Sequence, residues 1–447
     1  MTGEGPDLWT NRVHERAWVA GAPLAMHGSI AGVQNKMNRI SSMAIVPFIA
    51  ALSGCSSSSA TAPVQSAESD AGDFDGPFGA AASDDAGDNT GDDGSSGAIQ
   101  YEADLSGVQV VPGVKTAASG KGSFALSPDG TTLGYQISFS PADFAPTSVN
   151  VHLGAIGENT GTTHQLTPVS TNMTGQIALT VDEQAAIVSD HLYVDAPTQA
   201  YPNGELRGQI VLVGAEIFVA LPTAAQEVPA TASVYSAHAS FVMSPDQGSL
   251  VYHVVTTAAP TDIRLHRGIG GINGQVAYDL PLGNGLPLEG TLQIGGTTGN
   301  SDPTDLENGR FYLNIVTQQN PAGELRGQLI HAGESLFTGV LSGANEVPPI
   351  VSQANGGAQS ILSADQSTLK YEAEVSGVIP IGAEIDQGQP GQNGPLLDQL
   401  TLDQQGALGS LNMTPTIVQI LLSGGAYLNV KTPSYASGEL RAQLTIR

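Results

Sequence analysis

The sequence predicts an all-β protein, built as three tandem antiparallel β-sandwich domains behind an N-terminal region that we expect to be disordered. Two observations lead to this prediction. The chain of 447 residues contains 55 glycines and only 13% charged residues, with almost no long amphipathic pattern, which is typical of many short strands joined by turns. The six residues GELRGQ occur at 204–209 and 323–328, and GELRAQ follows at 438–443. These copies lie about a third of the chain apart, and the length leaves room for about three domains.

Two further landmarks repeat in the same register as GELR. Val-Pro pairs begin at 111, 228 and 347, which places them 117 and 119 residues apart. Between the Val-Pro and GELR landmarks, each copy has an alternating apolar pattern that is interrupted by SPDG, SPDQ or SADQ, and this pattern predicts a β-hairpin. A unit of about 115 residues is the size of a complete β-sandwich, so each copy can bury its own core. We therefore predict domain 1 at 99–213, domain 2 at 214–332 and domain 3 at 333–447.

The stretch before these domains resembles an export and anchoring signal. From Met37 the chain reads MNRISSMAIVPFIAALSGC: a short basic region, an apolar run of about ten residues and then small residues. The run is too short to span a bilayer, which takes about 20 apolar residues. Leu52-Ser53-Gly54-Cys55 resembles the lipobox of bacterial lipoproteins, in which the signal peptidase cuts before a cysteine that then carries lipid. Cys55 is the only cysteine, so an intramolecular disulfide is excluded. The alternative to a lipidated Cys55 is an incidental buried cysteine.

The N-terminal region divides into three expected segments. Residues 1–36 do not fit a signal peptide, so we expect translation to start at Met37 and 37–54 to be the lipoprotein signal peptide. Residues 55–98 then comprise the lipidated cysteine and an acidic tether, because 56–97 contain nine Asp or Glu and no Lys or Arg. Such a composition stays disordered, since burial cannot offset chain entropy. Its 42 residues give a reach on the order of 35 Å.

The charge balance narrows the possible partners. The chain has 15 Lys and Arg against 42 Asp and Glu, a formal net charge of −27. A surface of this sign repels nucleic acid, so we expect no nucleic-acid partner.

The repeated Glu-x-Arg has two possible interpretations. In a strand, residues i and i+2 share a face, so Glu205 and Arg207 are expected to point to the same side. They could recognise a ligand as a charged pair, or the arginine could bind backbone carbonyls or an Asp or Asn of the partner strand. We favour the structural role, because arginine is scarce outside these motifs, and we expect the glutamate to pair with an otherwise costly buried arginine. The motif residues are Gly204, Glu205, Arg207, Gly323, Glu324, Arg326, Gly438, Glu439 and Arg441.

Together these landmarks resemble the CHRD domain, first described in chordin. The resemblance rests on the Val-Pro opening, the hairpin, the glycine-rich middle at 268–276 and 388–396, and a Tyr-x-[Asn/Asp]-x-x-Thr ending before GELR. It covers residues 99–447, in all three copies. It implies an extracytoplasmic, noncatalytic module with a Greek-key sandwich similar to those of immunoglobulins and superoxide dismutase.

Family members often carry a His-x-His and a later histidine that look suited to binding a metal. This sequence keeps only His152 in the first copy and His266 in the second, and the third copy has Glu384 and Asp386 instead. One histidine per copy cannot form the three-imidazole site that copper and zinc enzymes use. We therefore expect no catalytic residues, no cofactor and no metal, with His152 and His266 as weak metal candidates.

The sequence thus predicts a membrane-anchored extracytoplasmic lipoprotein of the bacterial cell envelope, facing the periplasm or the cell exterior. Its partners would be the lipid membrane, through Cys55, and an unidentified extracytoplasmic protein or polysaccharide. The three domains would act as a noncatalytic module that binds this partner or has a structural role. The alternative is a copper- or zinc-binding protein with redox or superoxide-handling activity.

Overall fold

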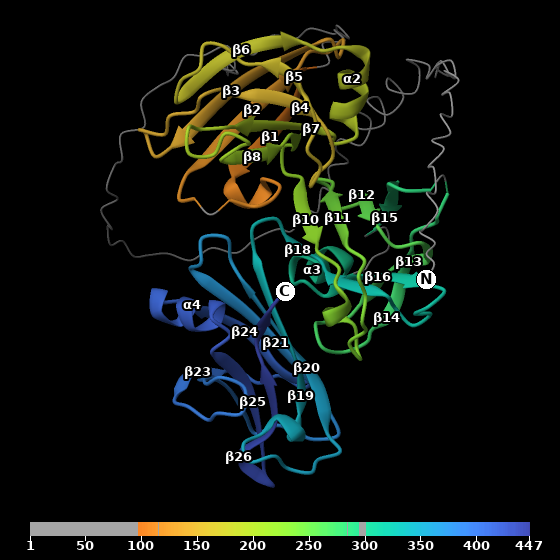
Figure 1. The fold of residues 1–447 in the computed structure, drawn as a ribbon, viewed down its shortest axis with the longest axis vertical. Coiled ribbons are helices and arrows are strands. Elements are labelled where there is room, and N and C mark those ends of the chain that lie inside the picture. The colour runs from red at the N-terminus through yellow and green to blue at the C-terminus, as the bar shows by residue number, and fades with distance from the viewer. Residues whose placement is uncertain (1–96, 115, 284, 295–300) are drawn as a thin grey trace, which may run out of the picture. The chain divides into compact units, whose positions relative to one another are not determined.

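The computed structural model describes residues 97–114, 116–283, 285–294 and 301–447. The predicted segments 1–36 and 37–54, nearly all of 55–98, and Cys55 itself lie outside the described residues. The described chain is all-β, as predicted, and consists of antiparallel strands with short helices between them (Figure 1).

The same order of elements occurs three times along the chain. Domain 1 contains β1 (Ile99–Ser106), β2 (Ser119–Leu126), β3 (Thr132–Ser140), β4 (Asn150–Leu153), β5 (Thr162–Gln165), β6 (Asn172–Ala178), α2 (Val181–Val188), β7 (Leu192–Ala196), β8 (Leu206–Gln209) and β9 (Val211–Leu212). Domain 2 contains β10 (Glu216–Ala220), β11 (Ala237–Met243), β12 (Ser249–Thr256), β13 (Pro260–Arg267), β14 (Gln275–Asp279), β15 (Leu288–Gln293), α3 (Asp302–Glu307), β16 (Phe311–Thr317), β17 (Leu325–Gln328) and β18 (Ile330–His331). Domain 3 contains β19 (Ser335–Ser342), β20 (Asn355–Leu362), β21 (Thr368–Ser376), β22 (Gly382–Gln387), β23 (Leu396–Leu400), β24 (Gly406–Asn412), α4 (Pro415–Leu422), β25 (Ala426–Thr432), β26 (Tyr435–Gln443) and β27 (Thr445–Ile446).

Each domain is a sandwich of a five-stranded and a four-stranded sheet. In domain 2 the two sheets have the orders β15-β12-β11-β10-β18 and β14-β13-β16-β17. In domains 1 and 3 the corresponding sheets are joined into one, because β1 pairs with β8 and β19 pairs with β26. The two sheets are joined by a single residue pair, which is Ser106↔Arg207 in domain 1 and Ser342↔Arg441 in domain 3. Domain 2 has an isolated β-bridge, Thr223↔Arg326, at the equivalent position. The GELR arginine therefore lies where the two sheets meet in every domain.

The predicted hairpins are confirmed. β2 pairs with β3, β11 with β12 and β20 with β21, each across the SPDG-type turn. Asp129 stabilises the first of these turns by accepting hydrogen bonds from Ser127 Oγ and from the backbone N–H of Thr131. The alternation of buried and exposed residues along β2 and β3 sends one face into the core, as a half-buried strand requires.

Each domain encloses a hydrophobic core of its own, to which its short helix contributes side chains. Phe124 belongs to the first core, Phe241 to the second and Phe337 to the third. These helices are not predicted from the sequence, because six to eight residues are too few to produce a periodic pattern. None of the helices in the described part of the chain is both long and apolar enough to cross a membrane.

Candidate functional site

The GELR arginine is buried in all three domains. Arg207 is 3% exposed, and Arg326 and Arg441 are 1% exposed. Each guanidinium lies over the ring of the tyrosine that begins the Tyr-x-[Asn/Asp] pattern, with its Cζ 3.5–3.6 Å from the centroid: Arg207 over Tyr193, Arg326 over Tyr312 and Arg441 over Tyr427. The aromatic faces stabilise the buried cations.

The arginine binds backbone carbonyls of one loop of the four-stranded sheet, the loop that joins β4 to β5, β13 to β14 or β22 to β23. We call this segment the tip loop; it comprises residues 154–160, 268–274 and 388–394. In domain 2, Arg326 Nη2 donates to the carbonyl of Ile269 at 2.8 Å and Nη1 to that of Ile272 at 2.7 Å. The equivalent acceptors are the carbonyls of Ala155 and Glu158 in domain 1, and those of Gln389 and Gln392 in domain 3. Charge-assisted bonds of this kind are among the stronger ones in proteins.

Two amide side chains complete the support of the tip loop, and sequence analysis missed both. The glutamine two residues after the arginine bridges the loop to the end of the helix: Gln328 Nε2 donates to the carbonyls of Gly268 at 2.6 Å and Gly309 at 2.7 Å. An asparagine of the loop donates to the valine carbonyl of the Val-Pro pair, at 2.6 or 2.7 Å, in all three domains: Asn159 to Val111, Asn273 to Val228 and Asn393 to Val347. Their recurrence in the repeat register is the signal that could have found them.

The glutamate of GELR does not pair with the arginine, so that expectation is wrong. Glu324 accepts from Thr317 Oγ1 at 2.7 Å and from Asn320 Nδ2 at 2.5 Å. In the other two domains, Glu205 accepts from Thr116 and Thr198, and Glu439 from Ser352 and Thr432. The alternation of a strand does not apply at this position in domains 1 and 2, because the glutamate precedes the first residue of β8 or β17. The glutamate closes the turn before the strand instead.

A different carboxylate lies beside the arginine in domains 2 and 3. Glu227 and Glu346, which precede the Val-Pro pairs, are both 8% exposed. Burial raises the pKa of each to about 7, although the arginine of the same domain opposes the shift. Gly323 makes room for this group, because a Cβ there would lie 2.5 Å from both carboxylate oxygens of Glu227. Domain 1 has the buried Val110 at this position.

The weak metal candidates also support the tip loop. His152 Nδ1 lies 3.1 Å from the carbonyl of Thr160, and His266 Nδ1 lies 3.1 Å from that of Gly274. A metal ion bound by His152 would need further ligands, and the nearby carboxylate of Asp195 lies 3.2 Å from His152 Nε2. No three His, Cys, Asp or Glu side chains within the described ranges are close enough together to hold a metal ion. These donors do not fit a copper or zinc centre, which takes three or four protein ligands.

The tip loop of domain 1 docks on the five-stranded sheet of domain 2. Ile156 is buried with Val242 of β11. Gly157 lies against the ring of His238, where a Cβ would be 2.3 Å from Cε1. Next to this contact, His253 Nε2 is 3.4 Å from Glu158 Oε1. The ring of His191, which follows α2, meets the ring of His253 edge-on at 5.8 Å.

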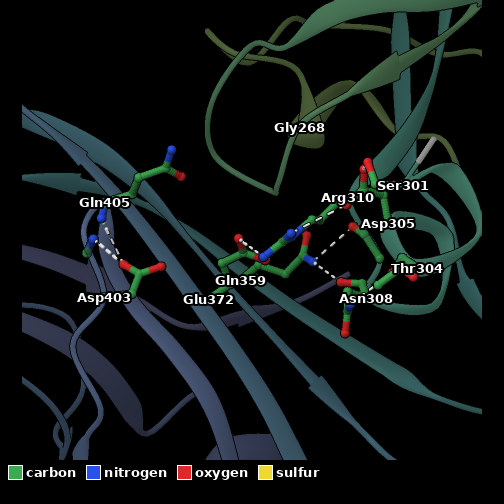
Figure 2. A network of polar contacts seen from close by, with 12 residues as sticks. Gly268, Ser301, Thr304, Asp305, Asn308, Arg310, Gln359, Glu372, Asp403 and Gln405 are labelled. Atoms are coloured by element: carbon green, nitrogen blue, oxygen red, sulfur yellow. Dashed lines mark hydrogen bonds and ion pairs between the residues drawn. The ribbon is translucent and has the colours of Figure 1, made fainter. Parts of the chain in front are cut away.

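The tip loop of domain 2 docks on domain 3, and Figure 2 shows the ion pair between Arg310 and Glu372 beside this contact. The backbone N–H of Gly270 donates to Gln359 Oε1 at 2.9 Å. Gly271 approaches the backbone of β19 so closely that a Cβ would lie 2.4 Å from the carbonyl oxygen of Gly339. Arg310, which follows α3, forms a bidentate ion pair with Glu372 at 2.8 Å for both contacts. The motif thus holds a loop that joins one domain to the next.

Comparison with known proteins agrees with this repeated architecture. The family model of the CHRD domain matches the chain three times, at residues 101–210, 218–329 and 337–444. No solved structure matches the chain. The three matches confirm the resemblance predicted from the sequence, and the chain belongs to the CHRD domain family as a protein with three tandem copies.

Proposed function

We propose that the chain is an extracytoplasmic lipoprotein of the bacterial cell envelope, whose three CHRD domains act as a noncatalytic binding or structural module. One observation carries the noncatalytic part. The GELR arginine, which repeats in all three domains, is buried and binds carbonyls of its own domain. A reactive or ligand-recognising pair would instead face a cleft with free hydrogen-bonding capacity.

The membrane anchor is supported by the sequence around Cys55. A lipobox-like LSGC follows a short apolar run, and the acidic segment 56–97 would separate the domains from the lipid headgroups. A lipid chain and a tether would place the three domains at the membrane surface without a membrane-spanning helix.

Detergent phase partitioning of the full chain expressed in a bacterium tests the anchor. We expect the wild-type chain in the detergent phase, with an intact mass that begins at a lipidated Cys55. Cys55→Ser should move the chain to the aqueous phase and leave its β-sheet circular dichroism unchanged. A wild-type chain that stays aqueous, or a mature mass that retains Met1, would reject the lipoprotein proposal.

The ligand would be an extracytoplasmic protein or polysaccharide. Three similar domains on one tether suit weak multivalent binding, because the first contact makes the later contacts intramolecular. Domain 2 has a surface groove lined by the segments 221–225 and 231–237 and by Asn320 and Glu324. Val234 at this groove is 95% exposed, which leaves an apolar contact available to a ligand.

Pull-down from envelope extract, with immobilised full chain, tests this binding role. We expect Val234→Glu to reduce recovery of the retained component. Ile379→Glu is the control, because Ile379 is an exposed residue of domain 3 outside the segment that corresponds to this groove, and it should leave recovery unchanged. Failure of the chain to retain any envelope protein or polysaccharide would contradict the binding role.

A further inference from the structure

The three tip loops have one shape but only two of them are docked among the described residues. Each has a glycine with positive φ at its apex: Gly157 at +87°, Gly271 at +90° and Gly391 at +77°. Gly157 and Gly271 touch the next domain, but nothing lies within 4 Å of a Cβ built on Gly391. Pro390 beside it is exposed, whereas its counterparts Ile156 and Gly270 are buried. The third loop is nevertheless held by Arg441, Gln443 and Asn393 just as the other two are held.

The surface that receives a tip loop also occurs three times, and in domain 1 no tip loop lies on it among the described residues. The receiving face is centred on a cross-strand pair of the hairpin: Ser240↔His253 in domain 2 and Gln359↔Glu372 in domain 3. All four of these residues are buried. The equivalent pair of domain 1 is Ser123↔Gln136 on β2 and β3, and both side chains are exposed.

We propose that the tip loop of domain 3 docks on the β2–β3 face of domain 1 in a second copy of this chain. The contact would continue, between chains, the interface that already joins domain 1 to domain 2 and domain 2 to domain 3. It joins two different surfaces, so it is heterologous and permits head-to-tail assembly.

The chemistry of the two surfaces permits this contact despite the net charge of −27. The third tip loop contains no charged residue. Ser123, Ala125 and Gln136 on the receiving face are uncharged, and the neighbouring charged residues Lys121 and Glu102 are of opposite sign. At the second junction Arg310 pairs with Glu372. In the proposed contact between chains, Gly425 of domain 3 and Gln136 of domain 1 stand at these positions, so the ion pair is absent. The contact is therefore weaker than the junctions within the chain.

Sedimentation velocity of the unlipidated full chain (Cys55→Ser) over a range of concentrations tests the proposal independently of membrane anchoring. We expect dimers and longer species to grow with concentration. Pro390→Glu on the tip loop and Ser123→Glu on the face should each abolish them. Pro433→Glu is the matched control, because Pro433 is exposed in the same domain but lies in the β25–β26 turn, and it should assemble like the parent chain.

Mixing the two variants distinguishes a head-to-tail contact from any symmetric one. The Ser123→Glu chain keeps an intact tip loop and the Pro390→Glu chain keeps an intact face, so the mixture should form dimers but no longer species. A parent chain that stays monomeric at all concentrations overturns the proposal. So does assembly that survives both substitutions, or a mixture that forms no dimer while the parent chain does.

Discussion

The two junctions between domains share a geometry but differ in side-chain chemistry. In both, a glycine tip touches the next hairpin, and a residue after the short helix meets a residue of the second hairpin strand. At the first junction that contact joins His191 to His253; at the second it joins Arg310 to Glu372. The backbone of the tip loop therefore determines where domains dock, while the side chains determine how each junction responds to pH and salt.

The largest expected effect comes from removing the arginine that holds a tip loop. Arg326→Ala leaves the carbonyls of Ile269 and Ile272 without their donor in a buried site. We expect a loss of about 3–5 kcal/mol in the free energy of unfolding of domain 2. Denaturant unfolding followed by circular dichroism measures it. Arg264→Ala is the control, since Arg264 is a half-exposed arginine of the same domain, and it should cost no more than about 1 kcal/mol.

Acid should weaken the first junction selectively. Burial, aided by His253 and Arg207 and opposed by Glu158, lowers the pKa of His238 from 6.5 to about 4. Between these two values the unfolded chain binds more protons than the folded chain, so stability is full above pH 6.5 and falls as the pH drops toward 4.

We expect His238 to contribute a loss of about 2 kcal/mol over this range, so His238→Asn should lose less stability than wild type between pH 7.5 and 4.5. Unfolding curves at pH 7.5 and 4.5 provide the test. An acid response that is identical in wild type and variant would show that His238 does not contribute.

Much of this architecture could be predicted from the sequence, because repeat register reveals which residues share a role. The SPDG hairpins and the three-domain CHRD resemblance followed from that register. The structural role of the arginine, with backbone carbonyls among its expected partners, was also predicted. The contacts of Glu324 were not, because strand alternation placed its carboxylate beside Arg326 while the turn at Gly323 directs it to Thr317. The contacts between domains could not be predicted from the sequence either. A glycine such as Gly271 has the same sequence signal in a loop exposed to solvent as in a loop that touches another domain.

The buried glutamate of domain 2 should produce a pH response opposite to that of His238. Burial, with Glu324, raises the pKa of Glu227 from 4.5 to about 7, against the effect of Arg326. The folded chain therefore binds more protons than the unfolded chain between these values, and the stability present below pH 4.5 is lost as the pH rises through 7.

Glu227→Gln should be more stable than wild type at pH 8 by about 1–2 kcal/mol, as calorimetry can measure. Domain 1, which has Val110 at this position, should not change. A variant that is less stable than wild type at pH 8 would mean that the carboxylate contributes more through Arg326 than burial costs.

The smallest effect concerns the ion pair of the second junction. A double-mutant cycle with Arg310→Ala and Glu372→Ala should give a coupling free energy of about 1 kcal/mol that decreases in high salt, because Arg310 remains partly exposed. The corresponding cycle with His191→Ala and His253→Ala should show little dependence on salt at pH 8. Equal salt dependence in the two cycles would remove the proposed difference between the junctions.

Hydrogen exchange of the Arg326→Ala chain, resolved by peptide, tests the central claim that the GELR arginine holds the docking loop. We predict faster exchange in the tip loop 268–274 and in β20, on which it docks, with no change in the tip loop 154–160, where Arg207 is intact. Unchanged exchange in 268–274 in a folded Arg326→Ala chain would contradict the claim.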